Sequence, residues 1–280
     1  MNYSRTILLL FLVILSCKPS STVNNSTEEK SYPRVYVLDG GYMLIKDLSY
    51  FTQDSVYDGQ SKYLDDPVFL IEHEKGRLIW DGGLPDAIAD QKPEDVDTSF
   101  WIINYIREKL IDQLAQMQLT PDSIDFFSIS HSHGDHVGNG NYFSNSTWLV
   151  HQNEYQLMMT SRRGDYDSLR MAKRIEFDGD YDVFGDSSVV ILSLPGHTPG
   201  HCSLLINLPK SGPLMLSGDL YHFIEQRGNR RIPKFNTDVA MTIESMEKFE
   251  ALVEKYNARV VIQHEREHYE LLPKYPEYLE

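Results

Sequence analysis

The segment 131–136, which reads His-Ser-His-Gly-Asp-His, constrains this chain more than any other feature, because it places four metal-binding side chains within six residues. An apolar run directly before it predicts a β-strand. Side chains two residues apart in extended backbone point the same way, so we expect His131 and His133 to bind one cation. A glycine then turns the chain, and Asp135 and His136 project toward a second cation. Imidazole and carboxylate are the donors that a borderline divalent cation such as zinc prefers.

The composition limits the classes of protein to which the chain can belong. It has 280 residues, of which 41% are hydrophobic, and this is enough for one large α/β domain or two small ones. The net charge is −15 and the isoelectric point is about 5.0. Nucleic-acid binding requires a basic stripe, so we expect no nucleic-acid partner.

The N-terminal residues predict an export signal rather than a part of the fold. Residues 7–15 form an uncharged apolar run, which is too short to span a bilayer but is typical of a secretory signal peptide. The run ends in Ile-Leu-Ser-Cys at 14–17, which resembles the lipobox of bacterial lipoproteins. We therefore expect a signal peptide at 1–16 and lipidation of Cys17, which anchors the exported protein to a membrane of the bacterial cell envelope, periplasmic or at the surface. An ordinary cleaved signal with an incidental cysteine is the alternative.

The remaining chain is interpreted as a tether followed by one domain. Cys17 and the polar residues up to 31 lack the apolar content to pack, so 17–31 is predicted to be a lipidated, flexible tether. No second linker follows, so 32–280 is predicted to be a single hydrolase domain. With Cys17 lipidated, Cys202 has no disulfide partner, and its apolar surroundings in sequence indicate a buried structural thiol.

The hydrophobic pattern predicts many strands and two long helices. Helices are expected over 100–119 and 239–256, where apolar residues recur every three or four positions. The order of the elements suggests two sheets packed face to face with helices outside. The long polar segments 47–66 and 84–99 are candidate walls of a binding cleft. Strands are predicted over 34–38, 68–72, 77–81, 124–130, 147–151, 189–194, 202–206, 213–217 and 259–263.

Three further candidate metal ligands each follow a predicted strand. His197 lies at the tip of a turn rich in proline and glycine, and His264 ends the last predicted strand. Asp219 follows another strand and supplies a carboxylate that can bridge two cations. Each would be weak evidence alone, but together with the first motif they form a specific pattern.

Taken in chain order, these motifs resemble the metallo-β-lactamase superfamily over residues 34–270. The resemblance implies an α/β fold, namely an αββα sandwich of two mixed β-sheets flanked by helices, with two divalent cations, expected to be Zn²⁺, at one edge. Asp81 would orient a metal-binding histidine without being a ligand. His201, His73, His151 and His268 are assigned structural or surface roles. The implied ligands are His131, His133 and His197 for one cation, Asp135, His136 and His264 for the other, and Asp219 as the bridge.

Finer features resemble the N-acyl homoserine lactonases, notably the segments 81–86, 196–206 and 210–213. The resemblance implies a metal-dependent hydrolase that opens the lactone ring of N-acyl homoserine lactones, which is quorum quenching, by a metal-bridging hydroxide. Asp135 or Asp219 would pass on the proton.

One position departs from the pattern of that group. Better-known members carry a tyrosine three residues after the bridging aspartate, where this chain has His222, with Tyr221 beside it. Either side chain is a candidate hydrogen-bond donor to the tetrahedral oxyanion. Several aromatic residues are candidates to line an acyl groove, or they simply pack within loops: Tyr50, Phe51, Tyr57, Tyr63, Phe100 and Trp101.

Other functions remain open on the same scaffold. A β-lactamase or a glyoxalase II-like thioesterase is the main alternative, although we identify no cationic residues for the glutathione carboxylate of the latter. A phosphoesterase would favour more positive charge near the site. An iron dioxygenase would use one cation and fewer ligands, and a binding module without activity would be indicated by a missing ligand. All seven candidate ligands are present in the sequence.

Overall fold

The computed structural model of the protein describes residues 32–160 and 166–280. The predicted signal peptide at 1–16, the lipidation site Cys17 and the tether up to residue 31 lie outside these described residues. Among the residues that are described, none of the helices combines the length and the apolar character that crossing a bilayer requires.

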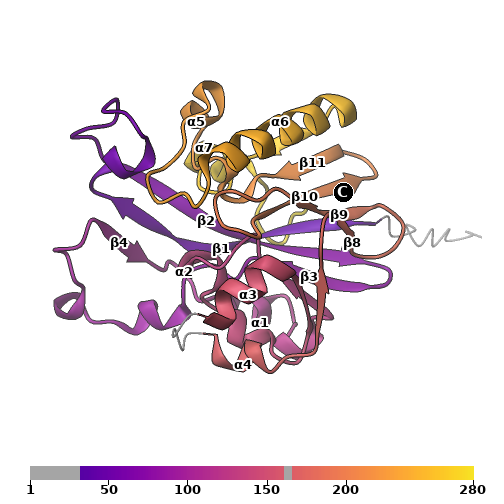
Figure 1. Cartoon of the computed structure of the whole chain (residues 1–280). Coiled ribbons are helices and arrows are strands. Elements are labelled where there is room, and N and C mark those ends of the chain that lie inside the picture. The colour runs from indigo at the N-terminus through magenta and orange to yellow at the C-terminus, as the bar shows by residue number, and fades with distance from the viewer. Residues whose placement is uncertain (1–31, 161–165) are drawn as a thin grey trace, which may run out of the picture. The chain divides into compact units, whose positions relative to one another are not determined.

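The first β-sheet has seven strands in the order β4-β1-β2-β3-β5-β6-β7 (Figure 1). It is mixed, because β4, β1, β2 and β3 pair antiparallel whereas β3, β5, β6 and β7 pair parallel. Its strands are β1 (Arg34–Ile45), β2 (Lys62–His73), β3 (Gly76–Trp80), β4 (Ile102–Tyr105), β5 (Phe126–Ser128), β6 (Thr147–His151) and β7 (Arg174–Phe177).

The second sheet has five strands in the order β12-β11-β10-β9-β8. It is also mixed, since only β11 and β12 pair parallel. Its strands are β8 (Tyr181–Asp182), β9 (Val189–Ser193), β10 (Cys202–Leu208), β11 (Gly212–Leu216) and β12 (Arg259–Val261).

Helices connect and cover the strands. The α-helices are α1 (Leu110–Gln116), α2 (Gly134–Val137), α3 (Gln152–Thr160), α4 (Asp167–Arg170), α5 (Ile224–Asn229), α6 (Val239–Tyr256) and α7 (Arg266–Leu271). Short 3₁₀ helices are η1 (Leu48–Phe51), η2 (Asp86–Asp90), η3 (Pro93–Asp95), η4 (Pro121–Ser123), η5 (Gly140–Phe143) and η6 (Gly218–Leu220).

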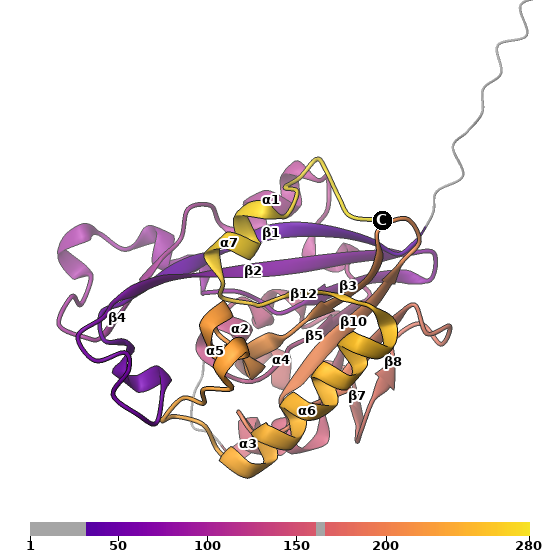
Figure 2. The same cartoon turned by 90° about the horizontal axis from the view of Figure 1, so that it is seen from above.

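Three buried clusters show how the layers pack. Alternate residues of β2 face opposite sides of the first sheet, because side chains alternate along a strand. Phe69 lies in the core between the two sheets, together with Leu204 of β10, whereas Leu70 packs on the outer face with Leu114 of α1. The outer face of the second sheet packs against α6, through residues such as Phe249. Figure 1 shows α6 above the paired sheets and α1, α3 and α4 below them, and Figure 2 looks onto α6 from above. The predicted αββα sandwich is therefore confirmed.

The helix predicted over 100–119 is wrong in its first half. Residues Ile102–Tyr105 form the edge strand β4, which pairs with the end of β1, and the helix covers only Leu110–Gln116. Edge pairing outweighs the helical spacing of the apolar residues there, because those residues bury equally well from a strand. The buried Asp86 marks the helix start, since its carboxylate accepts hydrogen bonds from the backbone N–H groups of Leu110 and Ile111.

The second predicted helix is confirmed with the same bounds, Val239–Tyr256. Asp238 caps it by accepting a hydrogen bond from the backbone N–H of Met241 at 2.9 Å. The predicted loop 47–66 is shorter than expected, because β2 already begins at Lys62. This strand runs to His73 and is therefore longer than the predicted strand 68–72.

Replacement of Leu204 by alanine tests the core between the sheets. This side chain is fully buried, so Leu204→Ala is expected to lower the free energy of unfolding by about 2–5 kcal/mol. The matched control is Leu271→Ala at a residue that is 83% exposed, which should change it by less than about 0.5 kcal/mol. Urea unfolding followed by circular dichroism measures both values, and equal losses would contradict this description of the core.

Candidate metal centre

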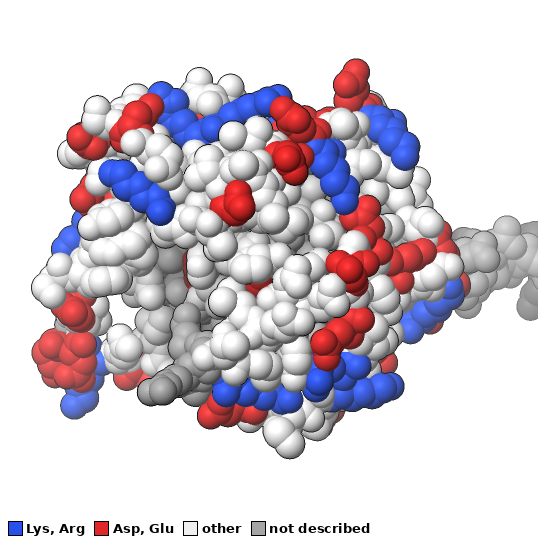
Figure 3. Space-filling model, viewed as in Figure 1, with Lys and Arg blue, Asp and Glu red and all other residues white. Residues whose placement is uncertain are grey.

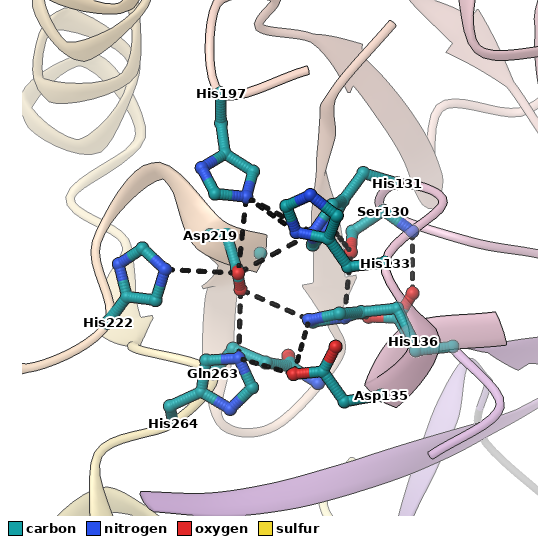
Figure 4. A network of polar contacts seen from close by, with 12 residues as sticks. Ser130, His131, His133, Asp135, His136, His197, Asp219, His222, Gln263 and His264 are labelled. Carbon is teal, nitrogen blue, oxygen red and sulfur yellow. Dashed lines mark hydrogen bonds and ion pairs between the residues drawn. The ribbon is translucent and has the colours of Figure 1, made fainter. Parts of the chain in front are cut away.

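The predicted ligands lie where strands of both sheets end. His131 and His133 follow β5, and α2 carries Asp135 and His136. The other three come from loops that follow the second sheet's strands: His197 after β9, Asp219 in η6 after β11, and His264 after β12. Because β9, β11 and β12 run in the same direction, their carboxyl ends meet at one edge of the sheet. Figure 4 shows that these side chains converge on Asp219.

Three imidazoles form the first donor group. Nε2 of His131 lies 2.8 Å from Nδ1 of His133, and Nε2 of His197 lies 3.2 Å and 3.1 Å from these two nitrogens. Protons on neutral rings cannot satisfy three nitrogens that all face one another. Three lone pairs directed at one point suit a cation instead.

The second donor group combines two imidazoles with a carboxylate. Nε2 of His136 and Nε2 of His264 each lie 3.8 Å from Oδ2 of Asp135. Asp219 stands between the two groups and divides its oxygens. Its Oδ1 is 3.2 Å from His136 Nε2 and 3.0 Å from His264 Nε2, and its Oδ2 faces His131 and His197 at 3.5 Å and 3.4 Å.

The donor set fits a pair of divalent cations that share one carboxylate. Asp219 Oδ1 is buried and faces the buried nitrogens His136 Nε2 and His264 Nε2 at 3.2 Å and 3.0 Å, so these atoms are placed to share a cation. The described residues contain two clusters that could each hold a metal ion: His131, His133, His197 and Asp219 in one, and Asp135, His136 and His264 in the other. The structure thus brings all seven predicted ligands together.

Neighbouring acceptors orient the ligand rings. Asp81 accepts a hydrogen bond from the backbone N–H of Ser130 at 2.6 Å, and its other oxygen lies 3.1 Å from His136 Nδ1. His264 donates through Nδ1 to the backbone carbonyl of Asp65 at 2.9 Å. A proton fixed on Nδ1 leaves Nε2 of each ring free toward the centre, which is how metal-binding histidines are commonly held.

His201 supports the bridging aspartate through the backbone. Its Nδ1 donates to the carbonyl of Leu194, so its Nε2 accepts the backbone N–H of Asp219 at 2.9 Å. Gly218 permits this contact, because it has a φ of +53° and a Cβ there would lie 2.7 Å from His201 Nε2. His201 therefore has the structural role that the sequence predicted.

The surroundings of the donors keep histidines of the first donor group neutral and the carboxylate of Asp219 charged. Burial lowers the pKa of His131 and His197 well below the usual value, so these rings remain neutral. Burial alone would lower the pKa of His136, but neighbouring carboxylates, chiefly that of Asp219, raise it well above that value. Burial alone would raise the pKa of Asp219, but the surrounding imidazoles hold it well below the ordinary value. The bridging position therefore stays anionic.

Glu154 is a functional residue that the sequence analysis missed. It is buried in α3, and one oxygen accepts the backbone N–H of Ser132 at 2.7 Å. The other oxygen accepts the hydroxyl of Thr198 at 2.7 Å and the backbone N–H of Gly200 at 3.0 Å. One carboxylate thus joins the two loops that supply the first donor group. A glutamate at the start of a helix carries no sequence signal for such a role.

Tyr221 and His222, the two candidate donors to an oxyanion, point in different directions in the structure. The side chain of Tyr221 packs in the cluster under α6, and its hydroxyl donates to Glu250 at 3.0 Å, so the role of Tyr221 near an oxyanion is wrong. Residue 221 has extended backbone, so adjacent side chains point in opposite directions. His222 therefore faces the centre, where its Nε2 is 3.1 Å from Asp219 Oδ2.

The remaining histidines lie outside the donor groups. Nε2 of His73 lies 3.1 Å from Oδ2 of Asp186, and its ring stacks on Phe184. Nε2 of His151 forms a hydrogen bond with the hydroxyl of Ser193. Nδ1 of His268 accepts the backbone N–H of Ile262. These contacts agree with structural roles.

A cavity of about 220 Å³ opens onto the donors. Of the predicted aromatic residues, Phe51 and Trp101 line it, and Phe100 lines a neighbouring groove that shares Asp135. Tyr50 stacks on Trp101, whereas Tyr57 packs on Phe223 and Tyr63 lines a separate depression. The cavity's lining is Met43, Ile45, Phe51, Leu64, Trp101, Ile102, His133, Asp135, Asp219, His222, Phe235 and His264.

Comparisons with known proteins identify the family that this chain resembles. A family model described as the metallo-beta-lactamase superfamily matches residues 67–264. The N-acyl homoserine lactonase AttM of Azorhizobium caulinodans is 30% identical over 261 residues, which cover 88% of this chain and 98% of that relative. AiiA, the N-acyl homoserine lactonase of Bacillus thuringiensis subsp. kurstaki, is 26% identical over 229 residues. These residues cover 78% of this chain and 89% of that relative.

Solved structures share the fold. An N-acyl homoserine lactone hydrolase with the product N-hexanoyl-L-homoserine bound at its catalytic metal centre superposes with a TM-score of 0.77. The two proteins are 24% identical in sequence, and the superposition covers 88% of this chain and 98% of that one.

Removal of one acceptor from Glu154 tests its role. In Glu154→Gln the amide keeps the shape but turns a donor toward Thr198 and Gly200, so the loop carrying His197 loses its anchor. We expect affinity for one divalent cation to fall about 10- to 100-fold, with the second site little changed. Titration with a chromophoric chelator measures both affinities, and Asn153→Asp on the same helix is the control. Unchanged affinity for both cations would contradict the role.

Proposed function

Since the chain belongs to the metallo-beta-lactamase superfamily, we propose that it is a metal-dependent hydrolase that opens the lactone ring of N-acyl homoserine lactones. The observation that carries this proposal is the set of seven converging donors beside an apolar cavity. The near full-length similarity to a lactonase at 30% identity supports it over other hydrolases of the fold. The activity is quorum quenching, because such lactones are the signals that it would remove.

Two zinc ions are the cofactors that we propose for the centre. Imidazole-rich donors with carboxylates suit a borderline cation. Bound there, the cations would supply an activated water near neutral pH and polarise the substrate carbonyl. The proposed ligands are His131, His133 and His197 on one side, Asp135, His136 and His264 on the other, and Asp219 between them.

The side chains of this chain would hold the substrate and move the proton. Asp135 lines the cavity and is the most accessible carboxylate of the centre, with 19% of its side chain exposed, so it is suited to accept a proton from the attacking water and deliver it to the leaving oxygen. Asp219 is 4% exposed and surrounded by imidazoles, so positioning is its proposed task. No side chain of the protein has to act as a nucleophile.

The apolar lining suits a neutral substrate with an acyl chain. Met43, Ile45, Leu64, Trp101 and Ile102 form a wall from which water is readily expelled. Acidic and basic residues alternate around the rim of the face in Figure 3, and the middle of that face is mostly uncharged.

A turnover panel tests the proposed function. The metal-loaded protein is given an acyl homoserine lactone, a β-lactam, a thioester and a phosphodiester, and each product is measured by chromatography. We expect the lactone to be opened much faster than the other three, and chelator treatment to abolish the reaction. An inert lactone beside a hydrolysed β-lactam or thioester would reject the lactonase in favour of the alternative.

Trp101→Ala tests the acyl cavity. The substitution removes a large apolar wall, so kcat/KM for a decanoyl lactone should fall about tenfold relative to that for a butanoyl lactone, a loss of order 1.4 kcal/mol in apolar contact. Tyr275→Ala, which removes an aromatic ring outside this cavity, is the control. Equal losses for both chain lengths would mean that the acyl chain does not lie against Trp101.

Lipid anchoring in the bacterial envelope is a separate part of the proposal. It is supported by the apolar run 7–15 and by the lipobox-like sequence that ends at Cys17. Expressed in a bacterial host, Cys17→Ser should move the protein from the membrane fraction to the soluble fraction and abolish labelling by a palmitate analogue. The buried thiol of Cys202 provides the control, since Cys202→Ser should leave the label in place. A membrane-bound, labelled Cys17→Ser protein would refute the anchor.

A further inference from the structure

His222 stands in the wall of the metal centre but has no role in the seven-donor set. It is 3% exposed and lines the cavity. Its buried Nε2 lies 3.1 Å from Asp219 Oδ2 and makes no hydrogen bond to any other described residue. The edge contacts of Phe51 and Phe235, with ring centroids 5.0 Å and 5.7 Å away, hold the imidazole in this orientation.

Gln226 determines which nitrogen of His222 carries the proton. The amide nitrogen of Gln226 donates to the backbone carbonyl of Phe51 at 2.7 Å, so the amide oxygen must be the atom that faces His222. This oxygen accepts the backbone N–H of His222 at 2.8 Å and lies 3.1 Å from Nδ1. An amide oxygen can only accept, and therefore Nδ1 bears the hydrogen.

In the tautomer with hydrogen on Nδ1 only, Nε2 carries a lone pair that faces the centre. In that tautomer Nε2 cannot donate a hydrogen bond to an oxyanion, which is the role that the sequence analysis allowed for His222. Two lone-pair atoms 3.1 Å apart, Nε2 and Asp219 Oδ2, repel each other unless a positive charge lies near both. This separation is similar to the 3.5 Å and 3.4 Å between Asp219 Oδ2 and the nitrogens of His131 and His197. His222 lies farther from the remaining donors, since it is not among the atoms that all lie within 4.8 Å of one another.

We propose that His222 is an eighth metal ligand, which coordinates through Nε2 the cation on the side of Asp219 Oδ2. The side follows from how Asp219 divides its oxygens, since Oδ2 faces His131 and His197 whereas Oδ1 faces the other donor group. The ring centroids of His222 and His197 are 5.4 Å apart, so the two imidazoles border the same space. This proposal rests on the metal centre of the proposed function and not on the identity of the substrate.

The added nitrogen would make the two positions chemically unlike. The first group holds the imidazoles of His131, His133 and His197, to which His222 would add a fourth through its contact with Asp219. The second has only His136 and His264 beside the carboxylate of Asp135. Nitrogen-rich sites favour borderline cations, and carboxylate-rich sites accept harder ones. The replacement of a tyrosine by His222 thus exchanges a hydrogen-bond donor for a metal donor.

The first experiment counts metal-bound rings in the unaltered protein. The full chain is labelled with ¹⁵N-histidine and loaded with ¹¹³Cd²⁺, and one-bond couplings between cadmium and ring nitrogens are recorded by NMR. We expect six of the ten histidines to be coupled, those at 131, 133, 136, 197, 222 and 264. Five coupled rings, with His222 uncoupled, would overturn the proposal, and no variant has to fold for this result.

The second experiment assigns the sixth coupling and measures its effect. In His222→Phe one coupling should disappear, and one of two Co²⁺ ions should bind about 10- to 100-fold more weakly, with a changed visible absorption spectrum. His151→Phe removes a buried histidine outside the centre and should retain all six couplings. An unchanged cobalt spectrum and affinity in His222→Phe would refute the ligand.

Lactone turnover is measured separately on the same samples. Six couplings without lactone opening would reject the lactonase and leave His222 as a ligand. Turnover with five couplings would reject the ligand and leave the lactonase.

Discussion

The carboxylate of Asp219 is the contact on which the rest of the structure depends. Its two oxygens lie within 3.0–3.5 Å of five imidazole nitrogens, four from loops distant in sequence and the fifth from His222. Without a cation these contacts leave lone pairs facing one another, so the arrangement is stable only where positive charge is shared among them. The fold can be understood as a scaffold that holds these groups at that separation.

The scaffold acts mostly through hydrogen bonds to backbone groups. Glu154 joins the two loops that supply the first donor group, and His201 fixes the backbone of Asp219. Asp81 orients His136, and the backbone of Asp65 orients His264. Each of these groups is buried among the sheet ends, so each loop is fixed by a partner from another part of the chain. Preorganised supports of this kind keep ligand geometry from depending on flexible side chains.

His222 illustrates how one substitution can change the chemistry of a shared scaffold. The resemblance to the lactonases led us to expect a tyrosine at this position, whereas here Gln226 places the hydrogen of His222 on Nδ1 and Nε2 faces Asp219. The sequence allowed either His222 or Tyr221 to act there. The choice required the extended backbone at residue 221, which sends the two side chains in opposite directions, and the amide of Gln226 four residues on.

The sequence by itself determined the donor set and the fold class, because metal ligands at strand ends follow a spacing that few other functions require. It also determined the helix Val239–Tyr256, whose periodicity and cap are local. Only the tertiary structure decided that Ile102–Tyr105 is an edge strand, that Glu154 joins two loops, and that Tyr221 faces away from the centre. These three features depend on partners that are distant in the chain. The residues of one segment do not show which strand it will pair with or which buried group it will bond to, so the sequence of that segment could not predict them.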